Sequence, residues 1–302
     1  MAIPENALFS RSHELIIGQK VITTGSPIEP PDARLFRNRI KFRVEKTTVP
    51  QPYKAKISLY NISQESRNFL EEEDLIVFLK AGYNEESKNI FTGEIRRRES
   101  SRSGPDVILT LECGDSEKIM QTAHIEISLS KGATNILLFQ LAAEKLGLSS
   151  GVNLGITQIT FRKSFHFSGL VKDLLNEQTK NINVEWNIQN GELRILPKEK
   201  TDTQEAVLID SSSGLIGFPT KTKEGLKFDS LLNNELWPGR AIKVVSKQYQ
   251  GQFGPASSFE AQTPLIDSGD VVKARRVIHE GDTKEGKWTS SVEAIIPRSG
   301  AI

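Results

Sequence analysis

The chain has 302 residues, 37% of them hydrophobic and 25% charged, which is typical of folded globular domains and excludes disorder, collagen and coiled coil as descriptions of the whole chain. Lysines and arginines number 39 and aspartates and glutamates 38, so overall charge provides no strong attraction to nucleic acid or anionic lipid. No run approaches the ~18 apolar residues of a membrane helix, and we expect no membrane partner.

Residues 1–120 have the pattern of a β domain. Residues 1–10 lack the basic start and apolar stretch of a signal peptide, so we expect no export by the general route. Further along, runs in which apolar and polar residues alternate predict half-buried strands. The uninterrupted apolar run 75–79 predicts a strand covered on both sides, and Ser63 is a candidate N-cap for a short helix over 63–70. The other strands are expected at 39–45, 54–62, 89–96 and 106–113, with loops at 24–31 and 100–105.

Residues 121–204 change to a mixed pattern and predict a small α/β domain. Helical spacing of leucines and alanines predicts a helix over 133–146, with Thr134 as N-cap and Gly147 as the stop. A second helix is expected over 168–179. Alternating strands on either side of Asn190-Gly191 predict a tight hairpin, because this pair readily adopts the positive φ of such turns. Residues 198–205 are interpreted as a charged linker.

Residues 205–302 return to the β pattern, without helical periodicity. Strands are expected at 226–228, 242–244, 271–278 and 292–296, and residues 251–270 are interpreted as a long loop or a poorly formed hairpin. The predicted fold class is therefore mainly β with α+β character, in which two β domains flank the α/β domain.

The two β regions share a weak internal similarity. Leu59-Tyr60-Asn61 corresponds to Leu231-Leu232-Asn233, and the strand at 75–79 to residues 241–245. Residues 93–97 correspond in the same way to residues 272–276. Any two small β domains share some of this rhythm, so chance stays open as an explanation. If the similarity is real, one chain carries two copies of one unit, and such chains can build rings with twice as many units as chains.

Residues that could carry chemistry are sparse. The chain has no nucleophile elbow, Walker loop, dinucleotide-binding glycine pattern or zinc-protease motif. The four histidines, at positions 13, 124, 166 and 279, are far apart and are interpreted as structural. Cys113 is expected to be a small buried hydrophobe, and Glu71 to Asp74 a solvated turn rather than a pair of catalytic acids. We therefore expect no catalytic residues, no metal and no cofactor.

Two arginine groups are the candidate contact residues. Arg96, Arg97 and Arg98 form the strongest basic patch, and Arg275 with Arg276 forms the second. Ion pairs with a neighbouring subunit or a tube protein are the favoured interpretation. Plain solvation and phosphate contact stay open as alternatives.

Several motifs together resemble the baseplate hub proteins of contractile-tailed bacteriophages, including those of phages T4 and Mu and the hub portion of type VI secretion spike proteins. The resemblance spans most of the chain and depends on the order and spacing of the motifs. They are Ala81-Gly82-Tyr83, Phe91-Thr92-Gly93-Glu94-Ile95, Phe167-Ser168-Gly169, Gly214-Leu215-Ile216-Gly217-Phe218-Pro219, Pro238-Gly239-Arg240 and His279-Glu280-Gly281-Asp282.

The resemblance implies a homotrimer in which two tube-protein-like β-barrels per chain form a pseudo-sixfold ring. Such a ring would join the sixfold tail tube to the threefold central spike. The chain stops at Ile302, soon after its final strand, so the spike is expected to be a separate polypeptide. The other implied partners are the tube or tube-initiator protein, the baseplate wedge proteins and the tape-measure protein. The implied location is the virion baseplate, with assembly in the host bacterial cytoplasm.

Two other functions are weighed against this structural hub. One is a tail-associated peptidoglycan hydrolase or peptidase built on β domains, which the absence of a convergent set of acids, nucleophiles or metal ligands disfavours. The other is a nucleic-acid-binding β protein, which the near-zero net charge disfavours. We therefore expect no sequence-specific binding of nucleic acid.

Overall fold

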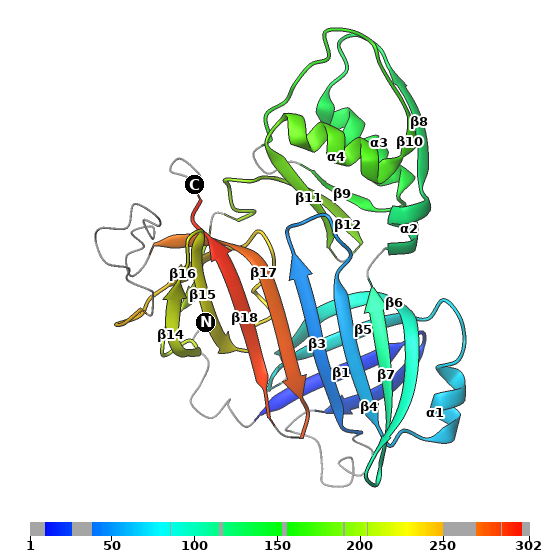
Figure 1. The fold of residues 1–302 in the computed structure, drawn as a ribbon, viewed down its shortest axis with the longest axis vertical. Helices are drawn as coiled ribbons and strands as arrows, with labels where there is room; N and C mark the ends of the chain where they lie inside the picture. The colour runs from blue at the N-terminus through cyan, green and yellow to red at the C-terminus, as the bar shows by residue number, and fades with distance from the viewer. Residues whose placement is uncertain are drawn as a thin grey trace.

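The computed structural model describes residues 10–25, 38–84, 86–114, 117–152, 156–189, 191–203, 205–249, 270–284 and 286–297. Strands dominate these residues, so the predicted mainly β class is confirmed (Figure 1). One 13-stranded sheet contains strands from both ends of the chain. Its main path runs β14-β15-β18-β17-β3-β4-β7-β6-β5-β1-β2, and off this path β16 pairs with β17 and β13 pairs with β16. The path ends at β14 and β2, and the described strands form no closed barrel.

The amino-terminal part contains seven strands of the large sheet and one short helix. Helix α1 begins after the predicted cap, where Ser63 accepts a hydrogen bond from the Ser66 amide at 3.1 Å. The elements are β1 (Arg11–Ile17), β2 (Lys20–Gly25), β3 (Ile40–Thr47), β4 (Lys54–Tyr60), α1 (Gln64–Phe69), β5 (Ile76–Tyr83), β6 (Glu86–Ser103) and β7 (Asp106–Gly114).

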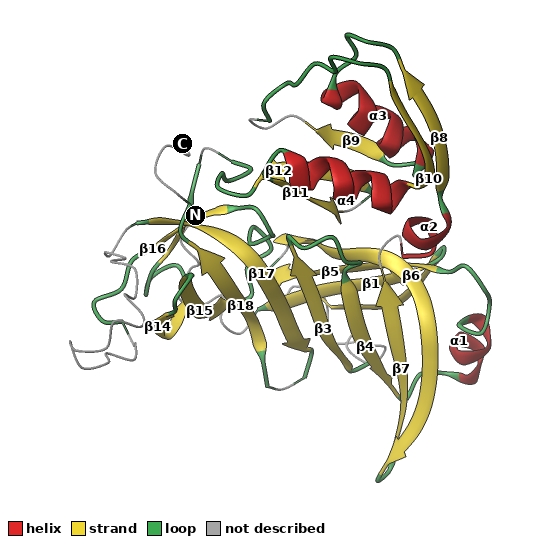
Figure 2. Cartoon of the chain, turned by 45° about the horizontal axis from the view of Figure 1, so that its top comes forward, coloured by secondary structure: helices red, strands yellow, loops and turns green. Residues whose placement is uncertain are grey.

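Two expectations for this part are wrong. The run at 75–79 is not covered on both sides, because Ile76 is 45% exposed and Phe78 is 36% exposed while Val77 and Leu79 are buried. The strand expected at 89–96 spans Glu86–Ser103, so Ser100 to Ser103 belong to a strand and the turn begins at Gly104. Figure 2 shows the resulting β6–β7 hairpin extending past the ends of the neighbouring strands.

The middle part packs helices against two small sheets and stands at one end of the large sheet (Figure 1). Its elements are α2 (Glu117–Thr122), β8 (His124–Leu129), α3 (Asn135–Lys145), β9 (Ser149–Val152), β10 (Phe165–Leu170), α4 (Val171–Asn181), β11 (Val184–Gln189) and β12 (Glu192–Pro197). Thr134 caps α3 through the Leu137 amide as expected.

Two further details of the middle part bear on the predictions. The second helix begins at Val171 rather than at 168, because residues 165–170 pair with β8 as a strand. The hairpin forms with Gly191 at φ 79°, and Asn190 lies outside the described residues. Tertiary pairing thus moved one helix boundary, while the local turn preference predicted the hairpin correctly.

The carboxy-terminal part adds β13 (Val207–Ile209), β14 (Leu215–Lys221), β15 (Gly225–Leu231), β16 (Ala241–Val244), β17 (Val271–Asp282) and β18 (Trp288–Ile295). The loop expected at 251–270 lies outside the described residues, apart from Asp270. Buried residues form three hydrophobic clusters, centred on β1–β7, on the middle part, and on β13–β18. The first cluster also includes Leu232 and Trp288, so two residues of the second β region pack into the core of the first. The boundaries at 120/121 and 204/205 stay a prediction.

Candidate functional site

The large sheet is built from two units with the same strand order. The first β unit consists of β3, β4, β5, β6 and β7, and the second of β14, β15, β16, β17 and β18. The strands of each unit follow one another in that chain order. Across the sheet, the first unit is ordered β3-β4-β7-β6-β5 and the second β14-β15-β18-β17-β16, and every neighbouring pair is antiparallel. This agreement in order and direction supports a repeated unit over a chance resemblance.

A β-bulge lies at the same place in both units. The register of β6 with β7 shifts between Ile95 and Arg97, and that of β17 with β18 shifts between Ala274 and Arg276. Arg96 and Arg275 are the extra residues of the two bulges. The alignment of residues 93–97 with 272–276 predicted from the sequence is therefore the one that the ladders have.

The other two parts of the sequence alignment are each displaced by one residue. Counted from Glu94 and Lys273, Ile76 rather than Leu75 corresponds to Ala241. Ala55 pairs with Cys113 just before the first bulge, and Leu226 pairs with Ala294 just before the second. Counted from these positions, Tyr60 rather than Leu59 corresponds to Leu231. A displacement of one residue reverses the face of a strand, so the ladders were needed to set this correspondence.

A row of charged residues crosses each unit at this bulge. Lys56 lies opposite Glu112, which lies opposite Arg97. In the second unit Lys227 lies opposite Glu293, which lies opposite Arg276. Here Nζ of Lys227 is 2.9 Å from Oε1 of Glu293, and this hydrogen bond, with the nearby charge of Arg276, holds the pKa of Glu293 below its ordinary value.

The two units meet at a seam, which we define as the antiparallel pairing of β3 with the second half of β17, from Arg276 opposite Thr47 to Asp282 opposite Lys41. In Figure 1 these strands lie side by side, although more than 220 residues separate them in sequence. Ion pairs cross the seam on the face opposite His279. Arg276 reaches Glu45 at 2.7 Å, and Arg39 reaches Asp282 at 2.8 Å.

Glu280 is the third carboxylate of the seam. It accepts hydrogen bonds from Arg43 across the seam and from Lys287. Partial burial acts to raise the pKa of Glu280, but these two cations lower it below its ordinary value on balance. The seam is thus an electrostatically matched edge-to-edge contact within one chain.

The opposite face of the seam is buried. His279 is 1% exposed, and its Nδ1 is 2.8 Å from the Ser290 hydroxyl. Burial, together with the charge of Lys46, lowers the pKa of His279 to about 3. Gly281 permits the close approach of Phe42 and Trp288, whose rings meet edge to face with centroids 5.3 Å apart.

Two strands equivalent to those of the seam have one free side each among the described residues. Arg97 to Ser103 of β6 pair only with β7, and β14 pairs only with β15. Along β14, Ile216 is 41% exposed and Phe218 is 50% exposed. Unpaired strand edges and exposed apolar side chains both favour association with another surface.

The predicted arginines lie at these features. Arg96 and Glu112 both line a hollow on the charged face, and the side chain of Arg97 is 67% exposed. Arg98 donates a hydrogen bond to the Glu72 carbonyl, and Arg275 forms an ion pair with Glu224. Arg276 forms an ion pair with Glu45 across the seam. Contact of any of the five with another chain stays a prediction.

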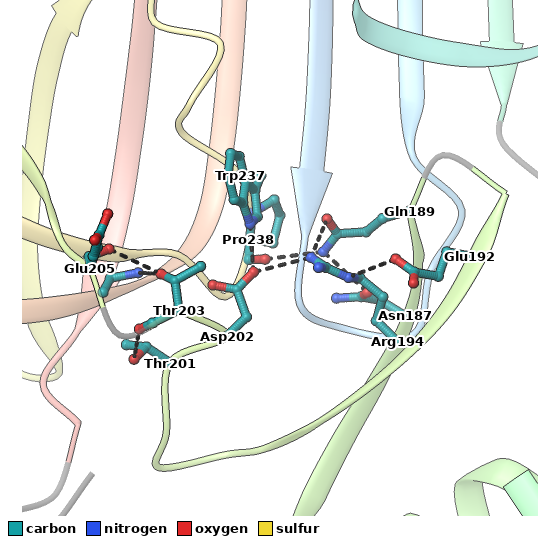
Figure 3. Close-up of polar contacts among 11 residues, drawn as sticks. Asn187, Gln189, Glu192, Arg194, Thr201, Asp202, Thr203, Glu205, Trp237 and Pro238 are labelled. Carbon is teal, nitrogen blue, oxygen red and sulfur yellow. Dashed lines mark hydrogen bonds and ion pairs between the residues drawn. The ribbon is translucent and has the colours of Figure 1, made fainter. Parts of the chain in front are cut away.

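The linker expected at 198–205 contains a buried carboxylate that sequence reasoning missed. Asp202, whose side chain is 0% exposed, accepts hydrogen bonds from Arg194 at 3.1 Å and from the Trp237 indole at 2.5 Å (Figure 3). Nearby, Gln189 donates to the Pro238 carbonyl at 3.0 Å, and the buried Lys273 pairs with Glu185. These contacts fasten the middle part to the second β unit.

Residues of the types most often used in catalysis lie in environments that indicate a structural role. Burial raises the pKa of the Cys113 thiol to about 12, so it is not a nucleophile at neutral pH. Glu71 to Asp74 are exposed, as expected of a solvated turn. The described residues contain no group of three or more histidines, cysteines or carboxylates placed to hold a metal, and none of the described helices could span a membrane.

Comparison with known proteins gives a consistent result. The family model described as baseplate hub gp41 matches residues 37–249. No curated protein matches the chain in sequence. A 43 kDa tail protein of prophage MuSo2 from Shewanella oneidensis has a similar structure, with a TM-score of 0.62, 8% identity, and coverage of 95% of this chain and 97% of that one.

Two further structures have the same fold. A tail protein from Neisseria meningitidis MC58 gives a TM-score of 0.55 at 9% identity, covering 95% of this chain and 97% of its own. The c3393 protein of E. coli gives 0.56 at 12% identity, covering 87% and 74% respectively. That protein is a component of the type VI secretion system and is structurally similar to the T4 tail proteins gp27 and gp5.

Proposed function

This chain belongs to the baseplate hub gp41 family, and we propose that three copies of it form a ring that joins the sixfold tail tube of a contractile phage tail to the threefold central spike. In this proposal the work of the protein is assembly, and no step requires catalytic turnover. For the alternative peptidoglycan hydrolase, the described residues contain no group of histidines, cysteines or carboxylates placed to hold a metal.

The presence of two equivalent β units joined at a seam within one chain carries the proposal. A ring of three such chains presents six similar units, so its surface toward the tube can have pseudo-sixfold symmetry. Its surface toward the spike keeps the true threefold symmetry, because the units differ in their loops and in the attached middle part. The tube-like barrel character belongs, in this proposal, to the closed ring wall rather than to a cylinder within one chain.

The charged face of the sheet is suited to form the inner wall of the ring. Charged side chains project from the face opposite the hydrophobic cores, in rows that continue from the first unit across the seam. A wall of mixed charge stays hydrated and suits a channel. We therefore propose that this face lines the lumen, and that the middle part lies outside it, where baseplate wedge proteins could reach it.

The remaining partners follow from the family's place in the tail. We propose a separate central spike protein, the tube or tube-initiator protein and the tape-measure protein as neighbours of the ring. The proposed location is the virion baseplate, assembled in the host cytoplasm. The division into parts at 1–120, 121–204 and 205–302 is kept as part of the proposal.

Copy number tests the proposal directly. The chain would be co-expressed with the spike protein of its own phage, and the purified complex weighed by native mass spectrometry. We expect three copies of the 33.6 kDa chain per complex. Images of the native baseplate provide the second readout, and any copy number other than three in that particle would refute the ring.

A further inference from the structure

We infer that neighbouring chains join by pairing the end of β6, residues 100–103, with residues 218–221 of β14 from the next chain, in an antiparallel ladder that repeats part of the seam. This inference rests on the proposed ring and assigns the strands and register of its subunit contact. The occupant of each free edge is thus a second copy of the same chain.

The seam itself provides the template. Within one chain, the fourth strand of the second unit, β17, pairs beyond its bulge with the first strand of the first unit, β3. The equivalent of that half of β17 is Arg97 to Ser103 of β6, which also follows a bulge. The equivalent of β3 is β14. Both of these strands keep one free side among the described residues.

The equivalence also predicts the register. Ser101 lies four residues beyond Arg97, as Glu280 lies four residues beyond Arg276. Thr220 lies opposite Lys227, as Arg43 lies opposite Lys56. Because Glu280 lies opposite Arg43 in the seam, Ser101 should lie opposite Thr220 of the next chain. By the same count, Ser100 should lie opposite Lys221.

The chemistry of the two edges suits this pairing. The side chains on one face of this half of β6 are polar, whereas the equivalent residues of β17 are buried in the seam. The equivalent pairs are Arg98 with Val277, Ser100 with His279, and Arg102 with Gly281. The contact would therefore depend on the backbone hydrogen bonds that residues 218, 220 and 221 can form, since Pro219 has no amide hydrogen, with the exposed Phe218 supplying apolar surface. A polar edge of this kind stays soluble until a partner strand arrives.

The joined edges differ, so the contact is heterologous and repeats around a ring. The described strand β2 is a competing edge, since it ends the sheet path on the other side and exposes Val21. It has no counterpart in the second unit, and the seam therefore supplies no template for pairing β2 with a neighbour. This makes β2 the natural control.

Cross-linking tests the register. Residues directly opposite in an antiparallel ladder have Cα atoms about 4.5–5.5 Å apart, within the range that a disulfide bridges. A chain carrying Ser101→Cys and Thr220→Cys would be assembled with the spike, oxidised mildly and analysed by non-reducing electrophoresis. The native Cys113 is buried and can stay in place. The control chain carries Ser101→Cys with Thr24→Cys on β2.

We expect most of the first variant to run as covalent dimers and trimers, and the control to run as single chains. Native mass spectrometry of the same samples separates the two proposals. A complex with three copies that yields no cross-link, or that cross-links as fully in the control, overturns the inference and leaves the ring standing. A spike complex that does not contain three copies overturns both.

Discussion

His279 illustrates how environment decides the role of a residue type that is often catalytic. Its side chain is buried against Ser290 at the seam, and burial keeps it neutral by lowering its pKa from 6.5 to about 3. Cys113 is likewise neutral because of burial. Neither group can exchange protons or attack a substrate near neutral pH. Both residues therefore contribute packing rather than chemistry.

The lowered pKa of His279 predicts a pH-dependent stability. Below pH 6.5 the unfolded chain takes up a proton at this position and the folded chain does not, so stability is present above that value and falls as the pH decreases. Between pH 7.5 and pH 5 this one group should remove about 2 kcal/mol from the free energy of unfolding. Urea titrations followed by tryptophan fluorescence measure the loss.

The matched control for this experiment is His279→Gln. It keeps the other histidines, so the difference in pH dependence between the two proteins isolates position 279. Equal losses in the natural chain and the variant over this pH range would show that His279 is protonated in the folded state.

At the scale of elements, the bulges explain why alternation predicted β6 and β17 only in part. Regular alternation of side chains along a strand would place Arg96 and Arg97 on opposite faces of the sheet. The extra residue at the bulge reverses the face to which each following side chain of β6 points. The strand also continues through a polar stretch that resembles a loop. Its pairing with β7, rather than its own composition, keeps residues 100–103 extended.

The seam between β3 and β17 depends on the absence of a side chain at Gly281. A Cβ atom there would lie 2.2 Å from Cζ of Phe42 and 2.8 Å from Cε3 of Trp288. We expect Gly281→Ala to force these rings apart and to lower the free energy of unfolding by about 1–3 kcal/mol. Chemical denaturation measures the change.

Ser101→Ala is the comparison for this substitution, because Ser101 lies on an exposed strand and should change stability by no more than about 0.5 kcal/mol. If Gly281→Ala were as mild as Ser101→Ala, the rings of Phe42 and Trp288 would have room to move, and the seam would be less tightly packed than described.

At the scale of the whole molecule, the free edges of the sheet make charge near β6 relevant to assembly. Arg97 begins the free half of this strand and Arg96 lines the neighbouring hollow. We expect the double substitution Arg96→Glu and Arg97→Glu to weaken formation of the ring or the particle, while the separate chain keeps its fold. Yield of three-copy complexes in native mass spectrometry measures the effect.

The control for this charge reversal lies in the middle part, where Arg162 and Lys163 are adjacent and exposed. Arg162→Glu with Lys163→Glu changes the net charge equally but lies away from the large sheet. Intact trimers and normal tails from the Arg96 and Arg97 variant would remove these arginines from the interface.

The sequence by itself determined the features that depend on neighbouring residues. Alternation, capping by Ser63 and Thr134, and the preference of Gly191 for positive φ are local, and they predicted the mainly β class, two helices and the hairpin. The motif order likewise identified the hub family that the family model matches over 37–249. The internal similarity located the equivalent arginines at the two bulges.

Only the tertiary structure decided which strands share an edge. The seam joins β3 to β17, the buried Asp202 ties the linker to Trp237, and the described strands of both β regions belong to one sheet. These are contacts between residues far apart in the chain, formed because strand edges need partners and buried charges need hydrogen bonds. A pattern read along the sequence carries no information about which distant edge or donor satisfies that need.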